Sequence, residues 1–309
     1  MHVSSRHVLR QGPMLAMLGK TAARAFAQRM RKGPSSQVVT PGPEFQRSFA
    51  PLPDDLLDQY IAHVGGDPRA YRGVVPPHFF PQWAMPVAAD ALAALPYPIL
   101  RVLNAGCRMQ VNKLLPRNEP LHVRAQLAAI DDDGKRALIT TRVVTSTESA
   151  PEGLVTEIYA FVPLAQPSKN GSNGGAKPAK SEKPRVPEGC HEIAFSKLGA
   201  DAGLSFAKLT GDFNPIHWVA PYARASGFRN VILHGFGTFA RACESLNRGL
   251  LGGDVRKLAL LEAKFTRPLV LPHAVGVYVR QREIYVGDGI QGPAYMTGHF
   301  ETREIGESA

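Results

Sequence analysis

The spacing of apolar residues predicts a long helix in the C-terminal half of the chain. Between residues 235 and 247, apolar side chains recur every three or four positions, which gives a helix with a wide apolar face. These side chains are Phe236, Phe239, Ala240, Cys243 and Leu246. Upstream, Pro221 suits the first turn of a short helix and Gly227 lies near its end.

Strands are predicted by stretches rich in Val, Ile, Tyr and Phe that are bounded by turn residues. The predicted strands are residues 121–130, 136–145 and 153–164 in the first half and 257–265, 274–285 and 294–302 in the second. Asp133-Gly134 is a hairpin signal between two of them. In each half, a polar loop and one apolar helix come before the strands. This order predicts an α+β fold in which an antiparallel sheet wraps a helix.

The two halves also share short motifs in the same order. The matched positions are Asp67 with Asp212, His78 with His234, and Pro116 with Pro268. Their offsets are 145, 156 and 152 residues, so the sequence predicts a duplicated domain with small insertions.

Between the halves, residues 166–188 are rich in Gly, Ser, Pro and Lys, and Val186 is their one large apolar residue. Such a segment cannot bury enough surface to offset its ordering entropy, so it is predicted to be a flexible linker. The predicted organisation is therefore a basic, flexible N-terminal extension over 1–42, one domain over 43–165, the linker, and a second domain over 189–309.

Composition and charge narrow the classes of protein. Hydrophobic residues make up 44% of the chain, which is enough for a sizeable core. The net charge is +10, but residues 1–43 carry +7 and residues 166–188 carry +3, which leaves the predicted domains near neutral. A nucleic-acid-binding protein would have its basic face on the domain itself, so no nucleic-acid partner is expected.

The cellular location is predicted from the cysteines and the N-terminal segment. The three cysteines are far apart, which excludes zinc spacing and a disulfide framework and suits a reducing compartment. No apolar run approaches the roughly 18–20 residues that cross a bilayer, so no integral membrane segment is expected. We expect a cytoplasmic protein; an organellar transit peptide and a membrane-surface helix remain open for the Arg-rich N-terminal segment.

The candidate chemistry lies in the stretch from Leu209 to His217. Asp212 and His217 are five residues apart, and Asn214-Pro215 between them disfavours a regular helix. A bent loop can turn both side chains toward one point, and one acid with one base can activate a water or move a proton. Gly-Asp and Asn-Pro are also common turn dipeptides, so either residue alone would be read as structural.

The surrounding pattern resembles a known family. Thr210-Gly211-Asp212-x-Asn214-Pro215-x-His217, followed by Ala225-x-Gly227-Phe228 and Ile232-x-His234-Gly235, is similar to the MaoC-like (R)-specific enoyl-CoA hydratases and (3R)-hydroxyacyl dehydratases. Phe265-x-x-Pro268 also fits. The resemblance implies the hotdog fold, and the duplicated layout implies the double-hotdog type.

The resemblance also implies roles and partners. Asp212 and His217 would hold the water that adds to C3 of a trans-2-enoyl thioester. Gly235, at the start of the apolar helix, would donate its N–H to the thioester carbonyl. Asn214 and Phe236 are expected to orient the loop or bind substrate. The substrate would be an acyl-CoA or acyl-ACP thioester of fatty acid metabolism, with no cofactor and no metal, and a homodimer is compatible with the pattern.

The first half departs from this pattern. It keeps Asp67 but has no Asn-Pro-x-His, and Phe79 stands where Gly235 stands in the second half. We therefore expect the first half to be catalytically silent, with His63 or His78 as less favoured substitutes for the missing imidazole.

Two other functions remain open at this point. A hotdog thioesterase would also use a carboxylate and water, and a non-catalytic acyl-binding subunit would bury Asp212 and His217 in packed core. His234 is assigned no role from the sequence.

Overall fold

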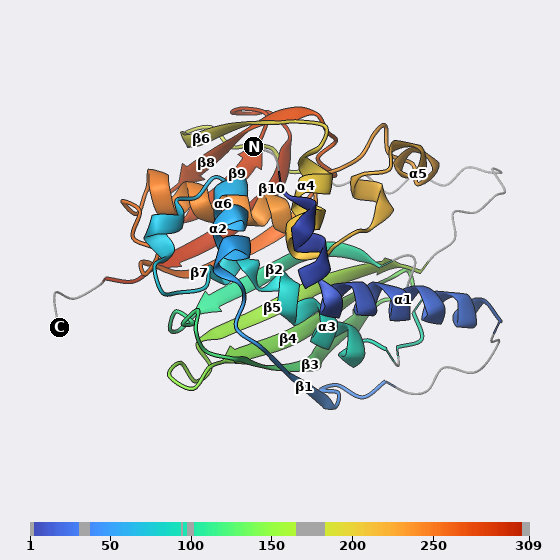
Figure 1. The fold of residues 1–309 in the computed structure, drawn as a ribbon. Coiled ribbons are helices and arrows are strands. Elements are labelled where there is room, and N and C mark those ends of the chain that lie inside the picture. The colour runs from blue at the N-terminus through green and yellow to red at the C-terminus, as the bar shows by residue number, and fades with distance from the viewer. Residues whose placement is uncertain (1–2, 31–37, 94, 98–101, 165–182, 305–309) are drawn as a thin grey trace, which may run out of the picture.

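The computed structural model describes residues 3–30, 38–93, 95–97, 102–164 and 183–304 (Figure 1). Its framework is a ten-stranded sheet with the order β1-β3-β4-β5-β2-β7-β10-β9-β8-β6. Neighbouring strands pair antiparallel throughout.

The strand order shows that the two halves are built alike. The first half contributes β1 (Glu44–Phe49), β2 (Leu103–Val111), β3 (Leu121–Asp132), β4 (Arg136–Ser146) and β5 (Leu154–Pro163). The second contributes β6 (His191–Leu198), β7 (Leu258–Phe265), β8 (His273–Arg280), β9 (Glu283–Gly287) and β10 (Ala294–Thr302). Reading outward from the middle of the sheet, each half follows the same sequence of strands. This is the arrangement that the internal repeat predicts.

The halves join through strands β2 and β7, which pair at the centre of the sheet. Gly106 lies at this junction, opposite Lys264. A Cβ on Gly106 would overlap the carbonyl oxygen of Ala263, so only glycine lets the two backbones approach this closely.

One helix lies against the sheet in each half. Helix α3 (Pro81–Ala91) contacts β1, β3 and β4, and helix α6 (Gly235–Gly249) contacts β6, β7 and β9. The two helices approach each other where they begin, because Phe80 packs edge-on against Phe236 and Phe239. The predicted helix over 235–247 and the α+β architecture are confirmed.

Each half also contains shorter helices, which flank the loop that holds Asp67 or Asp212. Helix α2 (Asp54–His63) in the first half and α4 (Ala202–Thr210) in the second contact one another. The remaining short elements are η2 (Pro68–Tyr71), η3 (Pro77–Phe79), η5 (Pro215–His217) and α5 (Ala220–Ala225). Pro221 lies in the first turn of α5, as its position in the sequence indicates.

One predicted strand is two strands. The stretch predicted as one strand over 274–285 is an antiparallel hairpin of β8 and β9, which turns at Gln281 with φ of +55°. The turn was missed because Gln281-Arg282 carries none of the Gly, Asn or Asp residues that mark a tight hairpin.

The N-terminal segment differs most from its prediction. Instead of a flexible extension, residues Ser5–Arg10 form η1 and Gly12–Met30 form α1. Val3, His7, Gln11 and Met14 are buried. These positions recur every three or four residues, but polar His7 and Gln11 interrupt the apolar pattern and hide the face from a hydropathy-based prediction.

The predicted linker is also shorter on its C-terminal side. Residues 165–182 lie outside the described residues. Val186 is buried in a cluster with Cys190, Tyr278 and Tyr285, so the second half begins before residue 189. Within the described part of the chain, no helix is both long and apolar enough to cross a membrane.

Candidate active site

The acidic loop of the second half begins where α4 ends, at Gly211. Gly211 terminates α4 with φ of +81° and donates its N–H to the carbonyl of Ala207, which is a left-handed C-cap. The loop after it is braced by its own side chains. Asp212 Oδ1 accepts from the N–H of Asn214 at 3.3 Å, and Asn214 Oδ1 accepts from the N–H of Ile216 at 3.3 Å. Asn214 thereby caps η5 and fixes the course of the loop.

The loop brings Asp212 and His217 together, and it adds His234. One carboxylate oxygen of Asp212 and one ring nitrogen of each histidine lie within 4.8 Å of one another. His217 is 8% exposed and His234 1%, whereas the Asp212 side chain is 33% exposed. The carboxylate thus lies at the rim of a site whose imidazoles are buried.

Hydrogen bonds fix which ring nitrogen of each histidine carries a proton. His217 Nδ1 lies 2.8 Å from the carbonyl of Ile232, which can only accept, so Nδ1 carries a hydrogen. His234 Nε2 donates in the same way to the carbonyl of Asp212 at 2.9 Å. The neutral His217 therefore presents its Nε2 lone pair, which is the form a general base requires.

Burial keeps both rings neutral near pH 7. It lowers the pKa of His217 below 6.5, against the opposing influence of the Asp212 carboxylate and the bond to Ile232. Burial also lowers the pKa of His234 to about 3, helped by the adjacent His217 ring. The two rings stack with centroids 3.6 Å apart, so a second positive charge here would be strongly disfavoured.

Asp212, His217 and His234 are also residue types that bind metals, so the prediction of no metal needs a geometric test. The two imidazoles lie nearly parallel, with 23° between their planes. Ring-nitrogen lone pairs lie in the ring plane, so stacked rings direct them side by side rather than toward one ion. The arrangement suits a proton-transfer site better, and the absence of a metal stays a prediction.

The N-terminus of α6 completes the site. His234 precedes the helix and makes no side-chain cap, and the first N–H groups of a helix have no partner within it. These groups and the helix dipole favour a negatively charged oxygen. A Cβ on Gly235 would lie 2.6 Å from the ring of Phe265, so glycine is required for this close packing.

Phe236 is not part of the loop. It is 5% exposed and packs edge-on against Phe265 and, across the junction of the halves, against Phe80. Its place in the apolar contact between the halves gives no support to the expectation that it orients the loop.

The Asp67 loop of the first half, which matches the Asp212 loop in the repeat, makes different contacts. Asp67 caps η2 and binds the Arg69 guanidinium through both carboxylate oxygens. This pairing lowers the pKa of Asp67 to about 2. Arg72 occupies the position five residues after Asp67, where the second half has His217.

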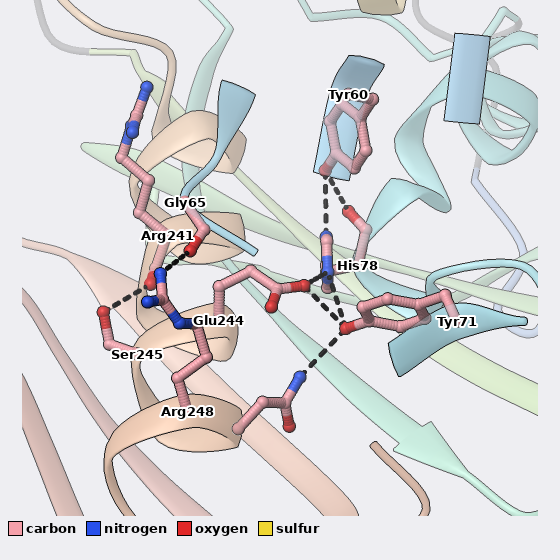
Figure 2. Close-up of polar contacts among 9 residues, drawn as sticks. Tyr60, Gly65, Tyr71, His78, Arg241, Glu244, Ser245 and Arg248 are labelled. Atoms are coloured by element: carbon pink, nitrogen blue, oxygen red, sulfur yellow. Dashed lines mark hydrogen bonds and ion pairs between the residues drawn. The ribbon is translucent and has the colours of Figure 1, made fainter. Parts of the chain in front are cut away.

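A buried polar cluster fills the space behind that loop (Figure 2). His78 Nε2 lies 2.7 Å from Glu244 Oε1, and Tyr71 donates to the same oxygen at 2.6 Å. Tyr60 binds His78 from the other side at 3.1 Å, and Asn247 donates to the Tyr71 hydroxyl at 2.9 Å. Glu244 and Asn247 come from α6 of the second half, so the cluster links the two halves.

The sequence analysis assigned no role to His234, and it named His78 without predicting its partners in this cluster. The internal repeat matches His78 to His234 and so could have marked both histidines as candidates. Glu244 was a second signal, since it is a carboxylate on the apolar face of α6 between Cys243 and Leu246.

Residues 190–296 match the family model described as MaoC like domain. This match covers the loop, both histidines and the start of α6, and it lies entirely in the second half.

Two sequence relatives carry related names. The probable enoyl-CoA hydratase 2 of Dictyostelium discoideum is 23% identical over 187 residues, which are 60% of this chain and 63% of that protein. The enoyl-CoA hydratase ChsH3 of Mycobacterium tuberculosis is 29% identical over 171 residues, or 53% of this chain and 56% of that protein. The chain thus spans less than two thirds of the length of these relatives.

A solved structure identifies the fold. A conserved protein of Mycobacterium tuberculosis described as having a double hotdog fold superposes with a TM-score of 0.56 at 15% identity. The alignment covers 86% of this chain and 97% of that one. The predicted double hotdog is confirmed, and at this identity the similarity extends to the fold alone.

Proposed function

We propose that this chain catalyses the reversible hydration of trans-2-enoyl thioesters to (3R)-hydroxyacyl thioesters, because residues 190–296 match the family model described as MaoC like domain. The observation that supports this most is the convergence of the Asp212 carboxylate and the His217 imidazole within 4.8 Å on one braced loop. The names of the relatives favour coenzyme A over acyl carrier protein as the carrier.

In the hydration direction, Asp212 and His217 hold the attacking water between them. His217 Nε2 accepts a proton as the water oxygen forms a bond to C3 of the substrate. The bond from Nδ1 to the Ile232 carbonyl stabilises the imidazolium that forms. The His217 imidazolium then gives this proton to C2, which returns the ring to its neutral form and completes the addition of one water across the double bond.

The developing enolate is stabilised at the start of α6. As C3 is attacked, negative charge moves to the thioester oxygen, where the N–H of Gly235 can donate a hydrogen bond. The donor is fixed before reaction by the packing of Gly235 against Phe265. Dehydration follows the same path in reverse.

Stereochemistry follows from the single loop. Since the acid and the base project from one side of the site, water reaches only one face of C3. We propose the (3R) product on the resemblance of the loop to the (R)-specific hydratases. A homodimer and a cytoplasmic location remain predictions.

The assay that tests this function supplies the full chain with trans-2-enoyl-CoA substrates of several lengths and separates the products by chiral chromatography. We expect 3-hydroxyacyl-CoA of one enantiomer, R, with the thioester intact. Free coenzyme A in place of the hydroxyacyl product would instead indicate a thioesterase. Tight binding of acyl-CoA without turnover would indicate an acyl-binding subunit.

A further inference from the structure

The N-terminal residues 3–14, here called the N-terminal strap, lie against both halves of the molecule where α4 runs into the catalytic loop (Figure 1). Their inward face is formed by Val3, His7, Gln11 and Met14, none of which is more than 2% exposed. The outward residue Leu9 is 89% exposed. The strap is thus docked through one well-defined face.

Polar contacts tie the strap to each half. On α2 of the first half, Gln59 Oε1 accepts a hydrogen bond from the N–H of Ser4 at 3.4 Å. Asp55, also on α2, pairs with Arg6 at 2.9 Å. On α4 of the second half, Lys208 Nζ donates to the carbonyl of Val3 at 3.4 Å. The strap therefore bridges the two helices that precede the two matching loops.

Gln11 makes the contact closest to the catalytic chemistry. Its Nε2 donates to the carbonyl of Leu209 at 2.8 Å, and its Oε1 accepts from Gln82 of α3 at 3.3 Å. The last carbonyls of a helix have no partner within the helix. Gln11 satisfies one of them at the C-terminus of α4, three residues before Asp212.

The strap also supports the backbone of the loop directly. A Cβ on Gly211 would lie 2.6 Å from Met14 Cβ and 2.9 Å from Gln11 Cβ. On the other side of the loop, His234 donates to the carbonyl of Asp212. The backbone at Gly211 and Asp212 is therefore held between the strap and His234.

We propose that Gln11 is a positioning residue of the active site, which acts through Leu209 and Gly211 to hold the Asp212 carboxylate against His217. The catalytic part of this proposal rests on the proposed function. Because an acid–base pair works only in a narrow range of geometry, a loop that loses this support would turn over more slowly while it still binds substrate.

Gln11→Met in the full chain tests the proposal, since methionine keeps the volume and flexibility of the side chain but removes both hydrogen bonds. Hydrogen exchange would be followed at the amides of residues 211–217 and, for comparison, in β4. We expect about tenfold faster exchange in the loop, the upper range for one buried hydrogen bond, with β4 unchanged. We also expect kcat to fall about tenfold, with KM changed less than about twofold.

The matched control is Leu9→Ala, which alters an exposed position of the same strap and should change neither measurement. Gln11→Leu, which also removes both hydrogen bonds of Gln11 and keeps an apolar side chain of similar size, should reproduce the faster loop exchange. Faster exchange throughout the chain would indicate general destabilisation and overturn the proposal, as would unchanged loop exchange in both variants. Faster loop exchange in a chain whose wild type hydrates no enoyl-CoA would uphold the support of the loop and reject the proposed function instead.

Discussion

His217→Ala is expected to lower kcat/KM for the hydration of trans-2-enoyl-CoA by about a thousandfold, the middle of the range for loss of a positioned general base. The reason lies in the geometry of the ring. His217 donates from Nδ1 to Ile232 and so offers Nε2 to the water. The nitrogen that His234 turns toward the Asp212 carboxylate is its Nε2, 3.9 Å away, and this nitrogen carries a hydrogen because it donates to the loop backbone.

The pH dependence of wild-type activity is a second test of the role of His217. Because burial lowers the pKa of His217, the ring stays neutral and active below the ordinary value of 6.5. The acidic limb of kcat/KM should therefore lie below pH 6.5, with activity lost as the pH falls through the lowered pKa.

The control for His217→Ala is His299→Ala, which removes an imidazole at an exposed strand position and should keep full activity. Turnover within threefold of wild type in His217→Ala would reject the assigned role.

Glu244→Leu is expected to lower the free energy of unfolding by about 3–5 kcal/mol, as is typical when one partner of a buried polar pair is removed. Glu244 is 2% exposed, and its Oε1 accepts from both His78 and Tyr71. Without the carboxylate, both groups lose their shortest hydrogen bond in a buried site, and only the 3.2 Å contact between the Tyr71 hydroxyl and His78 Nε2 remains between them. Urea unfolding followed by circular dichroism measures the loss.

A double variant separates the buried pair from general damage to the core. His78→Leu together with Glu244→Leu removes both polar partners, so it should cost less than the sum of the two single variants. Glu301→Ala, which alters a side chain that is 55% exposed, should stay within about 0.5 kcal/mol of wild type. Additive losses in the double variant would show that His78 and Glu244 are not energetically coupled.

The catalytic loop and its helix could be predicted from the sequence because their signals are local. Asn214-Pro215 breaks the helix, Gly211 allows the left-handed turn, and Asp212 and His217 lie within one short segment. The repeat then predicted the duplicated sheet, since each half carries the same elements in the same order.

The contacts around the loop could not be predicted, because they join residues far apart in the chain. Gln11 meets Leu209 across 198 positions, and His78 meets Glu244 across 166. In the sequence alone, each of these residues is a polar position within an otherwise apolar pattern, and nothing indicates its partner. Their pairing depends on how α2, α4 and α6 pack, which the local pattern does not specify.

The central claim is that the chain contains the acidic loop twice but the working site once. Its most direct test measures kcat/KM for trans-2-enoyl-CoA hydration in two matched variants, Asp212→Asn and Asp67→Asn. Asp212→Asn should lose about a thousandfold. Asp67→Asn should stay near wild type, because it breaks only an exposed pair with Arg69. Equal losses in both variants, or a loss confined to Asp67→Asn, would contradict the account.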